Sequence, residues 1–147
     1  MENIKGLLEQ LKDGKIEVGE VMAALRDLPY EDMGFARVDH HRGLRRGVPE
    51  VIYCEGKTPE QVAAITGKMM KNGSNVMGTR ASVQVFDEVK KIADSVRIEK
   101  AARMFIIESE KVPKNNGTIS VVSAGTSDIP VAEEAALTAE VFGNTVE

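Results

Sequence analysis

A small polar loop near the end of the sequence has residue types that can hold a phosphate group. In "SVVSAGTSDIPVAEEAAL" an apolar run leads into the loop, and an alanine-rich segment follows it. Gly125 is small enough for a ligand to approach the backbone, and the first turn of a helix presents unpaired N–H groups that favour an anion. Ser127 and Asp128 are good N-cap residues, and Pro130 fits the first helical turn, where no N–H is needed. The alternative is an ordinary strand-to-helix turn in which Ser127 and Asp128 only cap the helix.

A second group of chemically active residues lies in the basic segment "RVDHHRGLRRGVPEV". Guanidinium groups bind phosphate and carboxylate through paired hydrogen bonds, so these arginines predict an anion site. The alternative is a solvated loop whose arginines pair with Asp39 and Glu50. His40 and His41 predict no metal site, because adjacent residues of a strand point to opposite faces.

Two amphipathic helices are predicted before this segment. Their apolar residues recur at helical spacing and are Ile4, Leu7, Leu8 and Leu11, then Val18, Val21, Met22 and Leu25. Gly14 can provide a left-handed C-terminal cap between them, and Pro29 ends the second helix. Residues 1–30 are therefore predicted to form a helical hairpin.

The middle of the chain predicts an α/β domain over residues 31–112, a small mixed sheet with flanking helices. Strands are expected at "FARVDH", "PEVIYCEG" and "SNVMGTR", and "VRIEKAARMFIIES" predicts one or two more. One helix begins at Thr58, with Pro59 in its first turn and Gln61 completing a capping box. A second helix in "ASVQVFDEVKKIAD" is expected to bury Val85, Val89, Ile92 and Ala93.

The last part, residues 113–147, is predicted to hold a polar linker and one strand–helix unit. "ESEKVPKNNGT" is rich in turn residues, "TISVVSA" predicts a strand, and a helix is expected from about residue 128 to residue 142. One strand and one helix are too little for a parallel sheet. We therefore expect this unit to be less stable than the preceding domain, and to fray, to lean on the preceding sheet or to pair with another chain.

Composition limits the class of protein. The 147 residues are 42% hydrophobic, and with four Phe, two Tyr and no Trp the core must be mainly aliphatic. The net charge of −4 argues against a general nucleic-acid binder. The single cysteine, Cys54, excludes an intramolecular disulfide, favours a cytoplasmic setting and is expected to be buried and inert. No apolar run reaches the roughly 20 residues that span a bilayer, so no membrane partner is expected.

Two stretches of the sequence resemble known families. Residues 119–143 are similar to the opening strand–helix unit of PurE-type aminoimidazole ribonucleotide carboxylases, whose loop reads Gly-Ser-x-Ser-Asp-Trp. Ser127 and Asp128 match that motif, whereas Ile129 stands in place of the Trp. Over residues 17–143 the chain more closely resembles the LarB family, which is also described as circadian-phase-modifier-like. "VDHHRGLRRGVPEVIYCEGKTPEQV" and the later Thr79-Arg80 carry this resemblance.

The LarB resemblance implies a specific reaction. That family carboxylates C5 of the pyridinium ring of nicotinic acid adenine dinucleotide and hydrolyses the phosphoanhydride, in nickel-pincer nucleotide biosynthesis. A cysteine thiolate adds to the ring and makes a neutral enamine, whose carbon can attack CO2. The family cysteine lies in a downstream part of the PurE-like domain, and Cys54 does not match it. The chain alone is therefore expected to hold no catalytic residue and to be inactive.

The resemblance also implies the fold, the partners and the candidate site. The last strand and helix would open a flavodoxin-like, PurE-like domain, and the full-length form would be a homo-oligomer, an octamer. The partner is a dinucleotide substrate with CO2 or bicarbonate, without a covalently bound cofactor and with room for Mg²⁺. A non-catalytic nucleotide-binding module and an oligomerisation module are the alternatives. The candidate substrate-binding residues are Ser123, Gly125, Thr126, Ser127, Asp128, Arg42, Arg45 and Lys57.

Overall fold

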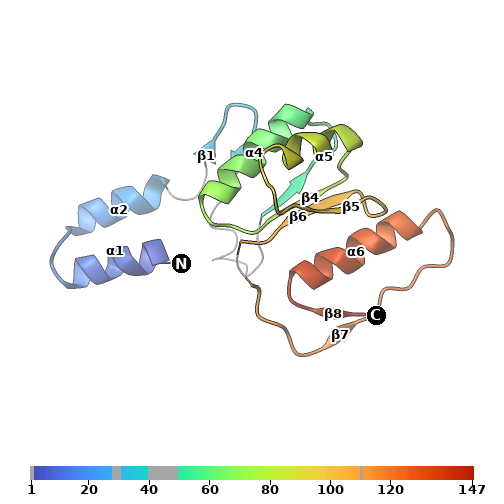
Figure 1. Cartoon of the computed structure of the whole chain (residues 1–147). Helices are drawn as coiled ribbons and strands as arrows, with labels where there is room; N and C mark the ends of the chain where they lie inside the picture. Colours follow the sequence, from blue (N-terminus) through green and yellow to red (C-terminus); the bar gives the residue numbers. More distant parts are fainter. Residues whose placement is uncertain (1, 28–30, 40–49, 110) are drawn as a thin grey trace. The chain divides into compact units, whose positions relative to one another are not determined.

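The computed structural model describes residues 2–27, 31–39, 50–109 and 111–147 (Figure 1). The chain divides into two compact units, Met1–Val48 and Pro49–Glu147. Within the described residues, no helix has both the length and the apolar character needed to cross a membrane.

The first unit contains the predicted helical hairpin. Helices α1 (Glu2–Lys12) and α2 (Val18–Asp27) are joined by a turn in which Gly14 has a φ of 69°, the left-handed conformation expected of it. Val21 is buried, but Val18 and Met22 are 62% and 57% exposed, so the apolar stripe of α2 is covered only in part. Two short strands follow, β1 (Glu31–Asp32) and β2 (Arg37–Val38), which pair antiparallel. The sequence predicted β2 but not β1.

The second unit is built on a four-stranded mixed sheet, and the predicted α/β class is confirmed. The strand order is β3-β4-β6-β5, formed by Val51–Tyr53, Val76–Thr79, Met104–Ile107 and Arg97–Glu99. β3 and β4 are parallel, while β6 runs antiparallel to both β4 and β5. The segment that predicted one or two strands therefore forms two, with a turn over residues 100–103 between them.

Helices α4 (Pro59–Lys71) and α5 (Val83–Lys90) lie together over one face of this sheet (Figure 1). The predicted capping box at α4 is confirmed: the Gln61 N–H donates to Thr58 Oγ1 at 3.3 Å, and the Thr58 N–H donates to Gln61 Oε1 at 3.0 Å. Ile92 was predicted to be buried and is 43% exposed, because α5 ends at Lys90. The buried residues of α4 and α5 and the turn after α5 include Val62, Ile65, Met69, Val85, Phe86, Val89 and Ala93.

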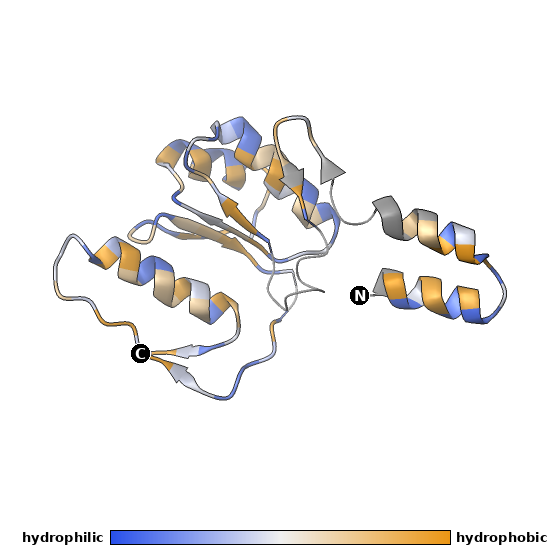
Figure 2. Cartoon of the chain, turned by 180° about the vertical axis from the view of Figure 1, so that it is seen from behind, coloured by the Kyte–Doolittle hydropathy of each residue, from blue (hydrophilic) through white to orange (hydrophobic). Residues whose placement is uncertain are grey.

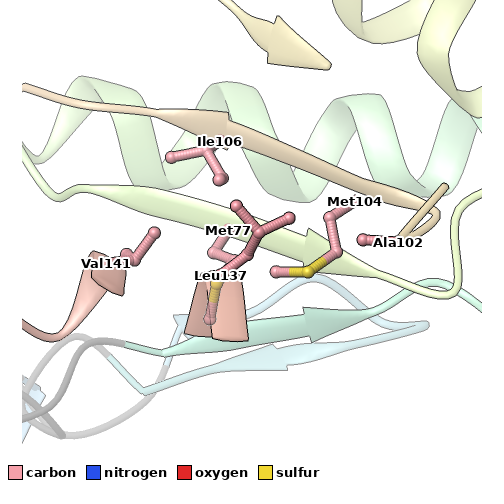
Figure 3. Packing of buried hydrophobic residues seen from close by; sticks show 6 residues of the cluster. All are labelled: Met77, Ala102, Met104, Ile106, Leu137 and Val141. Carbon is pink, nitrogen blue, oxygen red and sulfur yellow. The ribbon is translucent and has the colours of Figure 1, made fainter. Parts of the chain in front are cut away.

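Helix α6 (Ile129–Val141) lies over the other face of the sheet (Figures 1 and 2). Side chains alternate between the two faces of a strand, and all four residues of β4 and of β6 are buried, so each strand is covered on both sides. The predicted division after residue 112 stays a prediction. Of the three outcomes expected for this unit, the structure has the helix leaning on the preceding sheet. The cluster beneath α6 consists of Met77, Ala102, Met104, Ile106, Leu137 and Val141 (Figure 3).

The strand predicted before α6 is much shorter than expected. β7 (Thr118–Ile119) pairs in parallel with β8 (Thr145–Val146), a strand that the sequence did not predict. Val121 donates its N–H to Glu147 O at 2.8 Å, but Val122 is 91% exposed. The ladder ends there because β8 supplies only two residues to pair with.

Candidate functional site

The polar loop, residues Ser123–Asp128, connects β7 to α6. Its residues are exposed except for the half-buried Gly125. The Asp128 N–H donates to Gly125 O at 3.0 Å, which closes the turn. A Cβ on Gly125 would lie 3.4 Å from Asp128 Oδ2, so the carboxylate folds back over the glycine. The structure thus brings together five candidate residues in one exposed turn, which are Ser123, Gly125, Thr126, Ser127 and Asp128.

The start of α6 differs from the other two helix starts in this unit. Thr58 and Ser82 have extended backbones, with ψ of 155° and 168°, and each accepts a hydrogen bond from an N–H in its helix. Asp128 has a φ of −88° and a ψ of −17°, which is helical, and its side chain makes no capping hydrogen bond. The predicted capping role of Asp128 is therefore wrong. An N-cap side chain needs the extended conformation to reach back to N2 or N3. In α6 the N2 residue is Pro130, which has no N–H, and the Val131 N–H donates to Asp128 O at 3.0 Å, so the Ile129 N–H is the donor that remains in the first turn.

Ser127 does not cap the helix either. Its hydroxyl oxygen lies 3.4 Å from Asp128 Oδ1, within the loop itself. The side chains of Ser127 and Asp128 therefore stand next to each other beside a helix N-terminus, where hydroxyl, carboxylate and backbone N–H groups can contact the phosphate and sugar of a nucleotide.

Lys57 lies elsewhere in the unit, at the carboxyl ends of the parallel strands β3 and β4, which we call the carboxyl edge. Its Nζ donates to Tyr53 O at 2.7 Å, and its N–H donates to Cys54 O at 3.0 Å, which closes a turn with Gly56 at a φ of 80°. Among the described residues, no hydrogen bond or ion pair joins Lys57 to the polar loop. Arg42 and Arg45 lie outside the described residues.

Cys54 follows β3 directly and is 3% exposed. Its Sγ lies 3.5 Å from Ile52 O, a weak hydrogen bond. Removal from water raises the pKa of this thiol to about 12, and the nearby charge of Lys57 opposes that shift only in part. The predicted burial of Cys54 is confirmed, and the thiol is not ionised near neutral pH.

Sequence reasoning missed a group of polar side chains at the carboxyl edge. The Tyr53 hydroxyl donates a hydrogen bond to the Glu55 carboxylate, and Arg80 forms an ion pair with Glu134 of α6, Nε to Oε2 at 2.7 Å. The pKa of Tyr53 is raised, first by its hydrogen bond to Glu55, while the charge of Arg80 acts in the opposite direction. The signal that could have found this group is topological, since polar residues that follow adjacent parallel strands gather at one edge.

The described residues do not form a metal centre. No three His, Cys, Asp or Glu side chains among them lie close enough together to hold a metal ion. The polar loop offers a single carboxylate, that of Asp128, and Mg²⁺ is commonly held by one or two carboxylates together with substrate phosphates.

Comparison with known proteins gives two matches. Residues 30–110, more than half of the chain, match a family described as the LarB/PurE-like N-terminal domain. An uncharacterized protein of Methanocaldococcus jannaschii is 31% identical over 153 residues, which cover 96% of this chain and 58% of that protein. The chain thus spans a little over half the length of the curated relative that it matches. The family match includes Lys57 and Arg80 and ends before the polar loop.

Proposed function

The chain belongs to the family of the LarB/PurE-like N-terminal domain, and on this premise we propose that it is part of a LarB-type carboxylase/hydrolase. The proposed substrates are nicotinic acid adenine dinucleotide and CO2 or bicarbonate. The products are pyridinium-3,5-biscarboxylic acid mononucleotide and AMP, in nickel-pincer nucleotide biosynthesis. The setting that we propose is cytoplasmic, and the longer protein is proposed to be a homo-oligomer.

One observation in the structure supports this proposal more than any other. The polar loop ends at a helix whose N-cap side chain makes no capping hydrogen bond, and Ser127 and Asp128 stand exposed beside it. Pro130 has no N–H and the Val131 N–H donates to Asp128 O at 3.0 Å, so a phosphate group placed there would accept a hydrogen bond from the Ile129 N–H and would meet the positive end of the helix dipole. The carboxylate of Asp128 would repel a phosphate, and it is suited instead to accept hydrogen bonds from ribose hydroxyls.

The carbon chemistry must come from residues outside this chain. A pyridinium carbon is electron-poor and cannot attack CO2 until a thiolate has added to the ring and made it an enamine. The carboxylated ring then loses its proton at C5, and departure of the thiolate restores the pyridinium. Cys54 is the only cysteine here, and burial keeps it protonated. In this proposal the present chain binds and orients the nucleotide.

Binding of AMP to the chain tests the loop assignment. Amide chemical shifts, measured by NMR during titration with AMP, should move at Ser123–Asp128. Ser127→Ala and Asp128→Asn should each weaken binding about tenfold, as expected for loss of a hydrogen bond to a charged or polar ligand group. Asp94→Asn and Ser95→Ala are matched controls, because these residues form another exposed acid–hydroxyl pair in a turn. These two changes should leave binding unaltered.

The reaction itself is tested with a longer family member that includes this region. Incubation with nicotinic acid adenine dinucleotide and bicarbonate should release AMP, and Ser127→Ala should lower the rate. AMP binding without any turnover would favour a non-catalytic nucleotide-binding module. Absence of both binding and turnover would refute the proposal.

A further inference from the structure

Arg80 adopts a backbone conformation that is unusual for its residue type. It directly follows β4 and has a φ of 55°, in the left-handed region that favours glycine. The next residues are Ala81, which is buried, and Ser82, which caps α5. This conformation places the Arg80 side chain at the carboxyl edge, where β3 and β4 both end.

The backbone around Arg80 is fixed from the neighbouring hairpin. Arg103 also has a left-handed backbone, with a φ of 54°, in the turn before β6. Its carbonyl accepts the Ala81 N–H at 2.8 Å, and its guanidinium donates to Arg80 O at 3.3 Å. Arg80 is therefore held in place by contacts that do not involve its own side chain.

The guanidinium of Arg80 is held from one side and is open on the other. Its buried Nε lies 2.7 Å from Glu134 Oε2 in an ion pair that lacks the alignment of a hydrogen bond, and the Glu134 side chain is 22% exposed. Among the described residues, none accepts a hydrogen bond from the two Nη groups of Arg80, and the side chain is 36% exposed. A carboxylate that holds Nε leaves the two Nη groups free to bind an oxyanion as a fork.

The charges around this fork favour an anion. Lys57 and Arg103 lie at the same edge as Arg80, where the carboxylates of Glu55 and Glu134 accept from Tyr53 and pair with Arg80. The N-termini of α4 and α5 follow β3 and β4 at this edge, and their dipoles add positive potential. Side chains cap both termini, so the termini contribute positive electrostatic potential but few N–H groups that could bind an anion. The exposed ring of Tyr53, the residue that pairs with Thr79, borders the site.

We propose that Arg80 is the anchor of an oxyanion site at the carboxyl edge, separate from the polar loop, that takes a carboxylate or phosphate group of a small molecule. Glu134 orients the guanidinium, and Arg103 fixes the backbone that presents it. This inference does not rest on the proposed reaction, because it concerns binding to this chain alone.

The test measures weak binding directly. The chain is titrated with inorganic phosphate and, separately, with benzoate as an aromatic carboxylate, and the Arg80 Nε–Hε signal and nearby amides are followed by NMR. At least one probe should bind, and the stronger one identifies the group that the site prefers. Arg80→Gln should weaken binding about tenfold or more, and Arg80→Lys less, since a lysine keeps the charge but loses the fork.

Two further variants separate binding from folding. Arg80→Gly removes the guanidinium and relieves the left-handed backbone, so it should melt no lower than Arg80→Gln while also losing the anion. Arg97→Gln is the matched control, because Arg97 also pairs with a glutamate of α6, Glu140, at 3.9 Å, but lies on β5. It should bind both probes normally. Failure of both probes to bind, or equal binding by the wild type and a folded Arg80→Gln or Arg80→Gly, would overturn the inference.

Discussion

Among single residues, Cys54 decides what the chain can do by itself. A thiol becomes a nucleophile only when it is ionised, and burial beside apolar residues opposes ionisation. We expect the 147-residue chain to release no AMP from nicotinic acid adenine dinucleotide and bicarbonate, and Cys54→Ala to behave identically. Chromatography of the reaction mixture detects AMP directly. Turnover that disappears in Cys54→Ala would show that the thiol is reactive after all.

The same burial makes the stability of the chain depend on alkaline pH. The pKa of Cys54 rises from an ordinary value of 9.0 to about 12 in the folded state. Between these two values the unfolded chain loses the proton while the folded chain keeps it, so stability falls as the pH rises. The slope approaches about 1.4 kcal/mol per pH unit. Urea unfolding at several pH values in this window should show a steeper loss of stability for the wild type than for Cys54→Ala. Equal slopes would contradict the assigned shift.

Gly78 and Phe105 pack closely against each other within the sheet. It pairs with Phe105 across β4 and β6, and a Cβ at position 78 would overlap the phenyl ring. Gly78→Ala should therefore cost about 1–3 kcal/mol or more of unfolding free energy. Gly67→Ala is the control, because a Cβ there meets only Ile92 Cδ1 at 3.9 Å, and it should stabilise α4 by about 0.5–1 kcal/mol. Thermal unfolding of both variants measures the difference, and similar effects would mean that the ring moves aside freely.

At the scale of elements, helix starts were predictable where the cap residues and the backbone agree. Thr58, Pro59 and Gln61 are a local signal, and the capping box that they predict is present. Asp128 and Pro130 looked equally clear, yet Asp128 does not cap, because the loop before it delivers a helical backbone. That backbone is set by the turn at Gly125 and by the packing of α6, which a local pattern does not encode.

The two caps give opposite expectations for the same kind of substitution. Thr58→Ala removes the hydroxyl that accepts the Gln61 N–H and should cost about 0.5–2 kcal/mol. Asp128→Ala removes no capping hydrogen bond and should cost much less. Urea denaturation followed by circular dichroism compares the two variants under one condition. An equal loss in Asp128→Ala would show that its carboxylate does cap the helix in solution.

The strands divide in a similar way. Four of them, β3 to β6, carry apolar residues that the sequence made visible, and the turn between β5 and β6 resolved the one ambiguous segment. β1, β7 and β8 have two residues each and depend on a partner strand rather than on their own composition. The candidate residues of the polar loop could be found because they are consecutive in the sequence and form a local motif. Tyr53, Arg80 and Glu134 were not, because they meet only when strands and a helix assemble.

At the scale of the second unit, the position of α6 explains why both faces of the sheet are apolar. Without this helix, Met77, Met104 and Ile106 would face water. The alanine-rich sequence of α6 shows no strong amphipathic stripe, so only Leu137 and Val141 mark the face that is buried. The sequence therefore predicted the helix, but it did not predict whether the helix frays, packs on the preceding sheet or pairs with another chain.

Hydrogen exchange tests in solution whether α6 packs on the sheet or frays from it. Leu137 is buried in the cluster beneath α6, whereas the side chain of Val122 is 91% exposed in the polar segment before α6. If α6 packs as described, the Leu137 amide opens only when Leu137 and Val141 leave the core, so it should exchange orders of magnitude more slowly than the Val122 amide. The Val89 amide of α5 should exchange more slowly still, because α5 buries three side chains, including that of Val89, whereas α6 buries only two. Leu137→Ala should raise exchange throughout α6 while sparing α5. Equally fast exchange at Leu137 and Val122 in the wild type would mean that the helix frays from the sheet.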